Sequence, residues 1–182
     1  MALPRPSENP REPSDARLVA DAARGAPDAL AALYSRYARH LLAVAYRLLQ
    51  TTQDAEDVVH DVFVGLPEAL RRYEERGSLG SWLHKITARI ALMRLRERNA
   101  RPSVELQAQS LRAGANTPDT AISIEQALRT LPPNLRAVLV LKEIEGFTHA
   151  EIAAMLDISV GASEVRLHRA LAAMRAQLVD NT

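Results

Sequence analysis

Apolar side chains recur every three or four residues along most of this chain, which is the spacing that lines one side of an α-helix. In the first half, one predicted helix begins at Asp28, just after Pro27, and continues to residue 49. A second follows the apolar residues of 58–70, and a third runs from about 79 to 98 after a Gly-Ser break. The pattern predicts that the first half is α-helical almost throughout.

The helical pattern stops in two places. Residues 1–14 hold four prolines and no apolar run, which predicts a flexible tail and neither a signal peptide nor a membrane span. Between residues 99 and 120 the periodicity fades and Pro, Gln, Gly and Asn are interspersed, a composition typical of linkers. We therefore expect an all-α protein of two small helical domains, 15–98 and 121–182, joined by a flexible linker.

The second domain ends in two amphipathic segments joined by a tight turn. Thr148 and Glu151 have the spacing of a capping box, in which each side chain bonds a free backbone N–H at the helix start. Gly146 can end the preceding helix in a left-handed turn, and Ser159 is placed to cap the next helix. This layout predicts a helix-turn-helix, which places its second helix in a DNA groove.

Composition narrows the chemistry that the chain can perform. With no cysteine there is no disulfide and no cysteine-based zinc site, and the five histidines are scattered. No nucleophile-base arrangement, glycine-rich phosphate loop or metal-ligand spacing is present in the sequence. We therefore expect no catalytic residue, no metal and no cofactor, and nothing in the sequence points outside the cytoplasm.

The net charge of +1 would not by itself predict a nucleic-acid partner, but the charge is unevenly distributed. Residues 71–98 carry eight cations against three anions, together with two aromatic rings. Such a segment can attract phosphates and stack unpaired bases. Trp82 lies in register with the apolar positions of its helix, so we expect it to be structural. The candidate DNA-binding cations are Arg72, Lys85, Arg89, Arg94 and Arg96.

An acidic face precedes this basic segment. Asp54, Asp57 and Asp61 follow one another at steps of three and four, so they share one side of a helix and suit a basic partner surface. An ordinary solvated acidic face is the alternative. A metal site on Asp57 and His60 is disfavoured, because no second carboxylate-histidine helix completes a coordination shell.

The last helix has an apolar side that includes Leu167, Ala170 and Met174, which leaves polar side chains for the opposite side. Arginine binds phosphate oxygens or guanine edges, and glutamate accepts a bond from cytosine, so this helix could read a major groove. A solvated helix face is again the alternative. The candidate recognition residues are Ser163, Glu164, Arg166, His168 and Arg169.

Taken together, residues 15–178 resemble the extracytoplasmic-function (ECF) group of bacterial RNA polymerase sigma factors. The segment Asp54–Phe63 looks like the polymerase-binding helix of that family, and segments 77–83 and 91–96 resemble its minus-ten-element segment. In the second domain, the Leu-Pro-Pro at 131–133 and the segment Arg166–Ala170 match the part that reads the minus-thirty-five element.

The resemblance implies a factor that binds core RNA polymerase, recruits it to a subset of promoters and aids DNA opening without catalysing a covalent step. The polymerase-binding residues would be Asp54, Glu56, Asp57, His60 and Asp61, and an anti-sigma factor would be a further partner. One alternative is a regulator of the response-regulator output type, which shares the helix-turn-helix but does not explain residues 54–98. A helical adaptor or a carboxylate enzyme is the third reading.

The chain departs from the family pattern at several positions. Pro67 replaces a common Trp, and inside a helix proline removes a backbone bond at a cost of about 3 kcal/mol. Met93 and Arg89 stand at frequent Asp and Asn positions, and Asp157 replaces the usual turn glycine. Ser163 and Glu164 replace a commonly apolar and a commonly basic residue, so the promoter sequence cannot be inherited from relatives.

Overall fold

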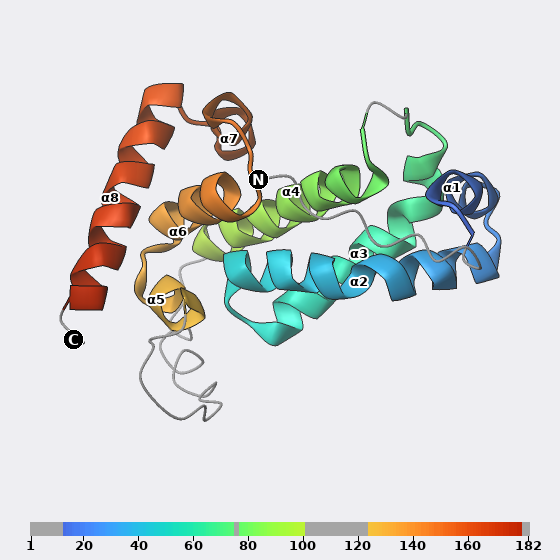
Figure 1. The fold of residues 1–182 in the computed structure, drawn as a ribbon, viewed down its shortest axis with the longest axis horizontal. Coiled ribbons are helices and arrows are strands. Elements are labelled where there is room, and N and C mark those ends of the chain that lie inside the picture. The colour runs from blue at the N-terminus through green and yellow to red at the C-terminus, as the bar shows by residue number, and fades with distance from the viewer. Residues whose placement is uncertain (1–12, 75–76, 101–123, 180–182) are drawn as a thin grey trace.

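The computed structural model describes residues 13–74, 77–100 and 124–179, and every regular element in these ranges is helical (Figure 1). The all-α prediction is confirmed. Most of the predicted tail and linker lies outside the described residues. In chain order the elements are α1 (Asp15–Ala23), α2 (Pro27–Leu49), α3 (Thr52–Leu70), α4 (Leu79–Ala100), α5 (Ile124–Thr130), α6 (Pro133–Leu139), the π-helical turn η1 (Val140–Ile144), α7 (His149–Leu156) and α8 (Val160–Val179).

The helix ends of the first half follow local chemistry. Ser14, at the end of the predicted tail, accepts a hydrogen bond from the backbone N–H of Arg17 and so caps α1. The helix α2 begins one residue before the predicted Asp28, because Pro27 suits the first helical position, where its missing N–H is not needed. Pro67 lies inside α3, which nevertheless continues to Leu70.

Buried apolar residues form two clusters. The first contains residues of α1 to α4 alone, among them Leu33, Leu41 and Leu83. The second combines Leu48 of α2 and Leu92 of α4 with residues of the second half. Figure 1 shows α6 next to the end of α2, and α7 contacts α4. The two halves therefore share a hydrophobic core, which the sequence pattern did not indicate.

A buried cation also connects the halves. Arg136 of α6 is only 5% exposed and donates hydrogen bonds to the carbonyl oxygens of Leu131, at 3.2 Å, and of Leu48, at 3.4 Å. Leu48 lies in the last turn of α2, where free carbonyls favour a positive charge. Burial, assisted by the charge of Arg98, lowers the pKa of Arg136 to about 10, so the side chain stays charged at neutral pH.

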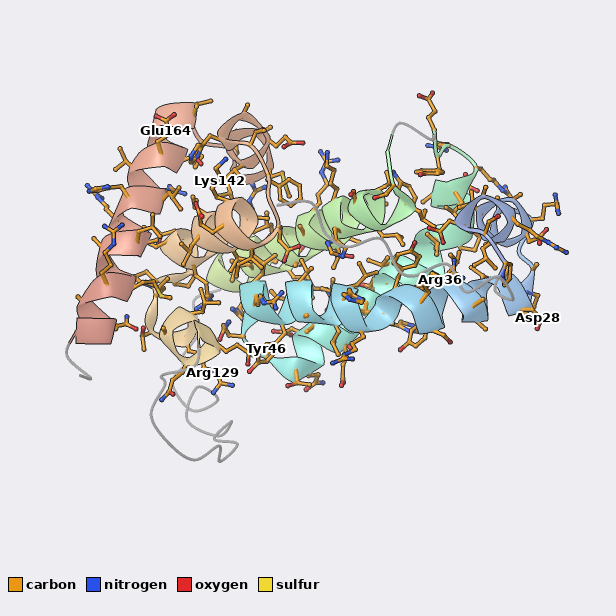
Figure 2. All side chains as sticks on the ribbon, in the orientation of Figure 1. Asp28, Arg36, Tyr46, Arg129, Lys142 and Glu164 are labelled. Carbon is orange, nitrogen blue, oxygen red and sulfur yellow. The ribbon has the colours of Figure 1, made fainter. Side chains whose placement is uncertain are left out.

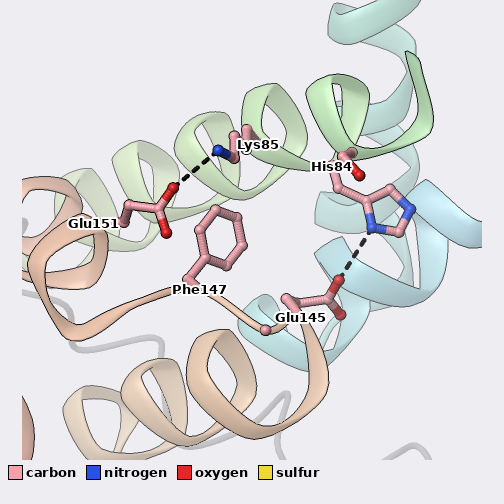
Figure 3. A pocket seen from close by; sticks show the side chains of 7 residues that line it. His84, Lys85, Glu145, Phe147 and Glu151 are labelled. Carbon is pink, nitrogen blue, oxygen red and sulfur yellow. Dashed lines mark hydrogen bonds and ion pairs between the residues drawn. The ribbon is translucent and has the colours of Figure 1, made fainter. Parts of the chain in front are cut away.

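A carboxylate is buried at the same junction. The Glu145 side chain is 4% exposed, and its oxygens lie 3.2 Å from Nδ1 of His84 and 3.7 Å from Nη1 of Arg47. His84 and Glu145 border a cavity of about 230 Å³, also lined by Lys85, Phe147 and Glu151 (Figure 3). Because α4, α7 and the segment after η1 all contribute, the cavity belongs to the junction between the halves.

Candidate nucleic-acid interface

The helix-turn-helix begins with the predicted capping box. The backbone N–H of Glu151 donates to Oγ1 of Thr148 at 3.2 Å, and the backbone N–H of Thr148 donates to Oε2 of Glu151 at 2.9 Å. This backbone hydrogen bond, together with one from Lys85, lowers the pKa of Glu151 to about 2. Gly146 has φ +75°, the left-handed conformation expected at this position.

The turn between α7 and α8 also follows the sequence prediction. Asp157 occupies the left-handed region with φ 55°, which aspartate tolerates better than most non-glycine residues. Ser159 accepts a hydrogen bond at 3.1 Å from the backbone N–H of Ala162, so it caps the start of α8. The local geometry of α7 and α8 is therefore that of a helix-turn-helix.

Ser163 does not have the exposed position expected for a DNA contact. Its side chain is completely buried, and its Oγ lies 2.9 Å from Nδ1 of His149 on α7. Positions 163, 167, 170 and 174 form one stripe at steps of four, three and four, so Ser163 continues the inward side of α8. That spacing could have revealed its burial. The prediction for Ser163 is wrong in this structure.

The other recognition candidates keep access to solvent. Glu164, His168 and Arg169 are exposed, whereas Arg166 is half-buried at the flank of the helix. The helix α8 packs on α6 and α7, and Figure 1 shows it at the opposite end of the molecule from α1. Figure 2 shows Glu164 in the upper part of α8, away from α2. The outer face of α8 also includes Val165, which is 50% exposed and is not among the residues predicted from the sequence.

The five basic candidates of the first half have different surroundings. Arg72 and Arg89 are exposed near the start and the middle of the basic segment. Lys85 donates a hydrogen bond to Oε1 of Glu151 at 2.9 Å, and Arg96 donates one to the carbonyl oxygen of Met155. The structure therefore engages two of these cations with α7 of the helix-turn-helix.

Arg94 has carboxylate partners within the first half. Its guanidinium donates to Oδ2 of Asp61 at 2.5 Å and to Oδ2 of Asp57 at 3.3 Å. Burial opposes the charged form, but the bonds to these carboxylates outweigh it and raise the pKa of Arg94. The predicted acidic face is thus partly neutralised by Arg94, a cation that the sequence predicts to bind DNA.

The five predicted polymerase-binding residues lie on two sides of α3. Asp54, like Asp57 and Asp61, faces α4: it accepts a hydrogen bond from Arg98 at 3.2 Å. Glu56 and His60 are exposed, and one further turn along lies Val64, which is 67% exposed. Because residues four apart share one side of a helix, these three form an outer stripe on α3.

Trp82 is half-buried beside the first cluster, and its ring centroid lies 4.8 Å from that of Tyr73. This packing agrees with the structural role predicted for it.

Within the described ranges, no group of three or more histidine, cysteine or acidic side chains is arranged to hold a metal ion. None of the helices in those ranges is long and apolar enough to span a membrane.

A helix-turn-helix joined to a basic helical unit is typical of a DNA-binding protein. Comparison with known families identifies the group: residues 33–101 match Sigma-70 region 2, and residues 121–174 match Sigma-70 region 4. The chain belongs to the ECF RNA polymerase sigma factors, which are transcription initiation factors that direct core RNA polymerase to promoters. The response-regulator alternative is not favoured, because both halves match sigma-factor regions.

Individual relatives extend over nearly the whole chain. The ECF sigma factor SigM of Mycobacterium tuberculosis is 32% identical over 162 residues, which covers 88% of this chain and 83% of SigM. The ECF sigma factor SigW of Bacillus subtilis is 26% identical, with coverages of 86% and 92%. Among solved structures, CnrH in complex with the cytosolic domain of CnrY has a TM-score of 0.55 and 27% identity, and the match covers 92% of this chain and 99% of CnrH.

Proposed function

We propose that residues 15–98 bind core RNA polymerase and the minus-ten element, and that residues 121–182 bind the minus-thirty-five element. On this proposal the protein acts in the cytoplasm, opens promoters together with polymerase and catalyses no covalent step. The observation that carries it is the combination, on one chain, of an open recognition face on α8 with a basic α4.

For polymerase, we place the docking surface on the outer stripe of α3, formed by Glu56, His60 and Val64. These side chains are exposed, whereas Asp57 and Asp61 are held by Arg94. A stripe that joins an acidic group to an exposed apolar group suits a partner that offers a cation beside an apolar residue. Asp57 and Asp61 contribute only when Arg94 releases them.

For the minus-ten element, Lys85 and Arg96 exchange their bonds to α7 for bonds to DNA phosphates. Glu151 and Lys85 are 40% and 56% exposed, so their ion pair is worth at most about 1 kcal/mol and is easily exchanged. The shared hydrophobic core contributes more to holding the halves together, because it buries many apolar side chains of both halves. Polymerase binding therefore has to supply most of the free energy that any rearrangement between the two halves requires.

An anti-sigma factor is a further proposed partner. CnrH is bound to the cytosolic domain of CnrY in its solved structure, and CnrH resembles this chain over almost its full length. Sigma factor RpoE of Bartonella quintana, with a TM-score of 0.55 and 22% identity, shares the fold and was solved in complex with the anti-sigma factor NepR.

The test is reconstitution of the full chain with bacterial core RNA polymerase, followed by affinity measurement and mapping of transcription starts. The double variant Glu56→Lys, Val64→Ala reverses the acidic group and removes the apolar one, and it should lower polymerase affinity at least about ten-fold, which corresponds to about 1.4 kcal/mol. Asp57→Lys with Asp61→Lys should also weaken binding while leaving the fold helical.

Asp28→Lys provides a matched control, because this exposed residue lies at the start of α2. Its polymerase affinity should stay at the wild-type value. If both α3 double variants bind polymerase as tightly as the wild type, the docking surface is not on α3. If the full chain forms no complex with core polymerase and directs no initiation, the proposed function as a whole is wrong.

A further inference from the structure

Val165 lies at the centre of the outer face of α8. An α-helix turns by about 100° per residue, so Ser163, Ala170 and Leu167 all point within about 40° of the direction opposite to Val165. Ser163 and Ala170 are fully buried, which fixes that opposite direction as the inner side of the helix-turn-helix. Val165 therefore points straight away from the protein, and half of its surface is exposed.

Charged and polar groups surround this apolar side chain. On the same helical geometry, Arg169 lies about 40° to one side of Val165 and His168 about 60° to the other. Both are exposed. Val165 also lies in the second turn of α8, and the first turns of a recognition helix are the part that reaches base edges. An apolar group at this place is exposed to water in the free protein. Contact with an apolar group on a base removes its surface from water, which favours binding.

Gly161 supports the same inference independently. It lies one turn before Val165 on the same face, and a Cβ built on it would meet nothing within 4 Å. Its backbone does not adopt a positive φ, so neither packing nor conformation within the described residues demands glycine there. Glycine is a poorer helix former than alanine. Glycine is expected here if this surface has to approach another molecule closely, because a side chain would stand in the way.

We propose that Val165 reads a thymine of the upstream promoter element through the C5 methyl group in the major groove, and that Gly161 allows α8 to approach that base closely. The methyl group is the one apolar feature that a base pair presents in this groove, and apolar side chains recognise it. Arg169 then reaches the neighbouring phosphate or a guanine edge. The inference rests on the proposed role of α8 in upstream-element binding.

Uracil provides a sharp probe, because it pairs as thymine does but lacks the C5 methyl group. The full chain, bound to bacterial core RNA polymerase, is first used to select duplexes from a randomised upstream element. Each thymine of the selected element is then replaced singly by uracil, and the affinity of the holoenzyme is measured. We expect one position to lose about four-fold in affinity, the factor that corresponds to about 0.8 kcal/mol for one buried methyl group.

In the Val165→Ala variant, that position should lose most of its preference for thymine over uracil, because the alanine side chain is shorter than that of valine. Val160→Ala, at the other exposed valine of α8, is the matched control: it lies about 140° around the helix from Val165 and should keep the wild-type preference for thymine. The proposal is overturned if the selected element contains no thymine whose methyl group matters, or if Val165→Ala keeps the full preference.

Gly161→Ala tests the second part. Because alanine is the better helix former, the thermal unfolding midpoint should not fall, whereas affinity for the selected duplex should decrease. Unchanged DNA affinity would refute the role of Gly161. A holoenzyme that selects no upstream sequence at all would instead count against the proposed function, so the two failures can be distinguished.

Discussion

Replacing Ser163 by alanine tests whether this residue is a structural link or a DNA contact. Its Oγ is buried and lies 2.9 Å from Nδ1 of His149, so the variant loses one intramolecular hydrogen bond. Such a bond contributes about 0.5–1.5 kcal/mol to the free energy of unfolding. His149 is half-buried, so water can reach its ring and replace the lost partner. We therefore expect a loss of about 1 kcal/mol, without the larger penalty for an orphaned buried group.

Urea unfolding of the full chain, followed by far-UV circular dichroism, measures this loss. Ser35→Ala is the control, because Ser35 is exposed on α2 and should change the free energy of unfolding by less than about 0.5 kcal/mol. A double-mutant cycle of Ser163→Ala with His149→Ala isolates the bond and should return a coupling of about 1 kcal/mol. A coupling of zero would refute the structural link.

The same variants separate stability from DNA binding. At a temperature where all of them are folded, Ser163→Ala should change upstream-element affinity by less than about two-fold, since the side chain cannot reach DNA. Arg166→Ala should cost about 1–3 kcal/mol if the guanidinium contacts a base. A large affinity loss in folded Ser163→Ala protein would restore the original assignment of Ser163 to the DNA interface.

Three further predictions concern the helix-turn-helix and the shared core. Gly146→Ala should destabilise the chain by about 1–2 kcal/mol in thermal or urea unfolding, because φ is +75°, whereas Gly65→Ala in α3 should not destabilise it. The pKa of Glu151 is lowered to about 2, so its ionised side chain contributes fully to the free energy of unfolding above the ordinary glutamate pKa of about 4.3. This contribution is lost as pH falls from about 5 towards 2, and Glu151→Gln should flatten that part of the stability–pH curve. Leu48→Ala should lower the free energy of unfolding by about 2–5 kcal/mol and leave a single transition for both halves, and two separate transitions in calorimetry would contradict a shared core.

Local features of the fold could be predicted because they depend on neighbouring residues. The capping box of Thr148 and Glu151, the left-handed Gly146 and Asp157 and the cap at Ser159 all arise within a few positions of the chain. Helix positions followed from apolar spacing for the same reason. Burial of Ser163 was also readable from this spacing, but its polar side chain and its place beside Glu164 suggested an exposed site.

The partners of the charged residues could not be predicted. Lys85 and Glu151 are 66 positions apart, and Arg94 reaches Asp61 across 33 positions, so sequence spacing carries no information about these pairs. A charged side chain on the outer side of a helix differs little in free energy whether it contacts solvent, a partner or another helix. The packing of the helices therefore decides which of these contacts it makes. This is why the acidic face of α3 proved to be partly occupied by Arg94.

The sequence by itself determined the class of the protein, the positions of its helices and the local geometry of its helix-turn-helix, because these depend on residue type and short-range spacing. The tertiary structure alone decided that the two halves share one core, that Arg136 and Glu145 are buried at their junction, and which charges remain open to partners. It also placed Val165 at the centre of the open face of α8. These properties arise where segments distant in sequence exclude water from one another, and the sequence order does not specify that contact.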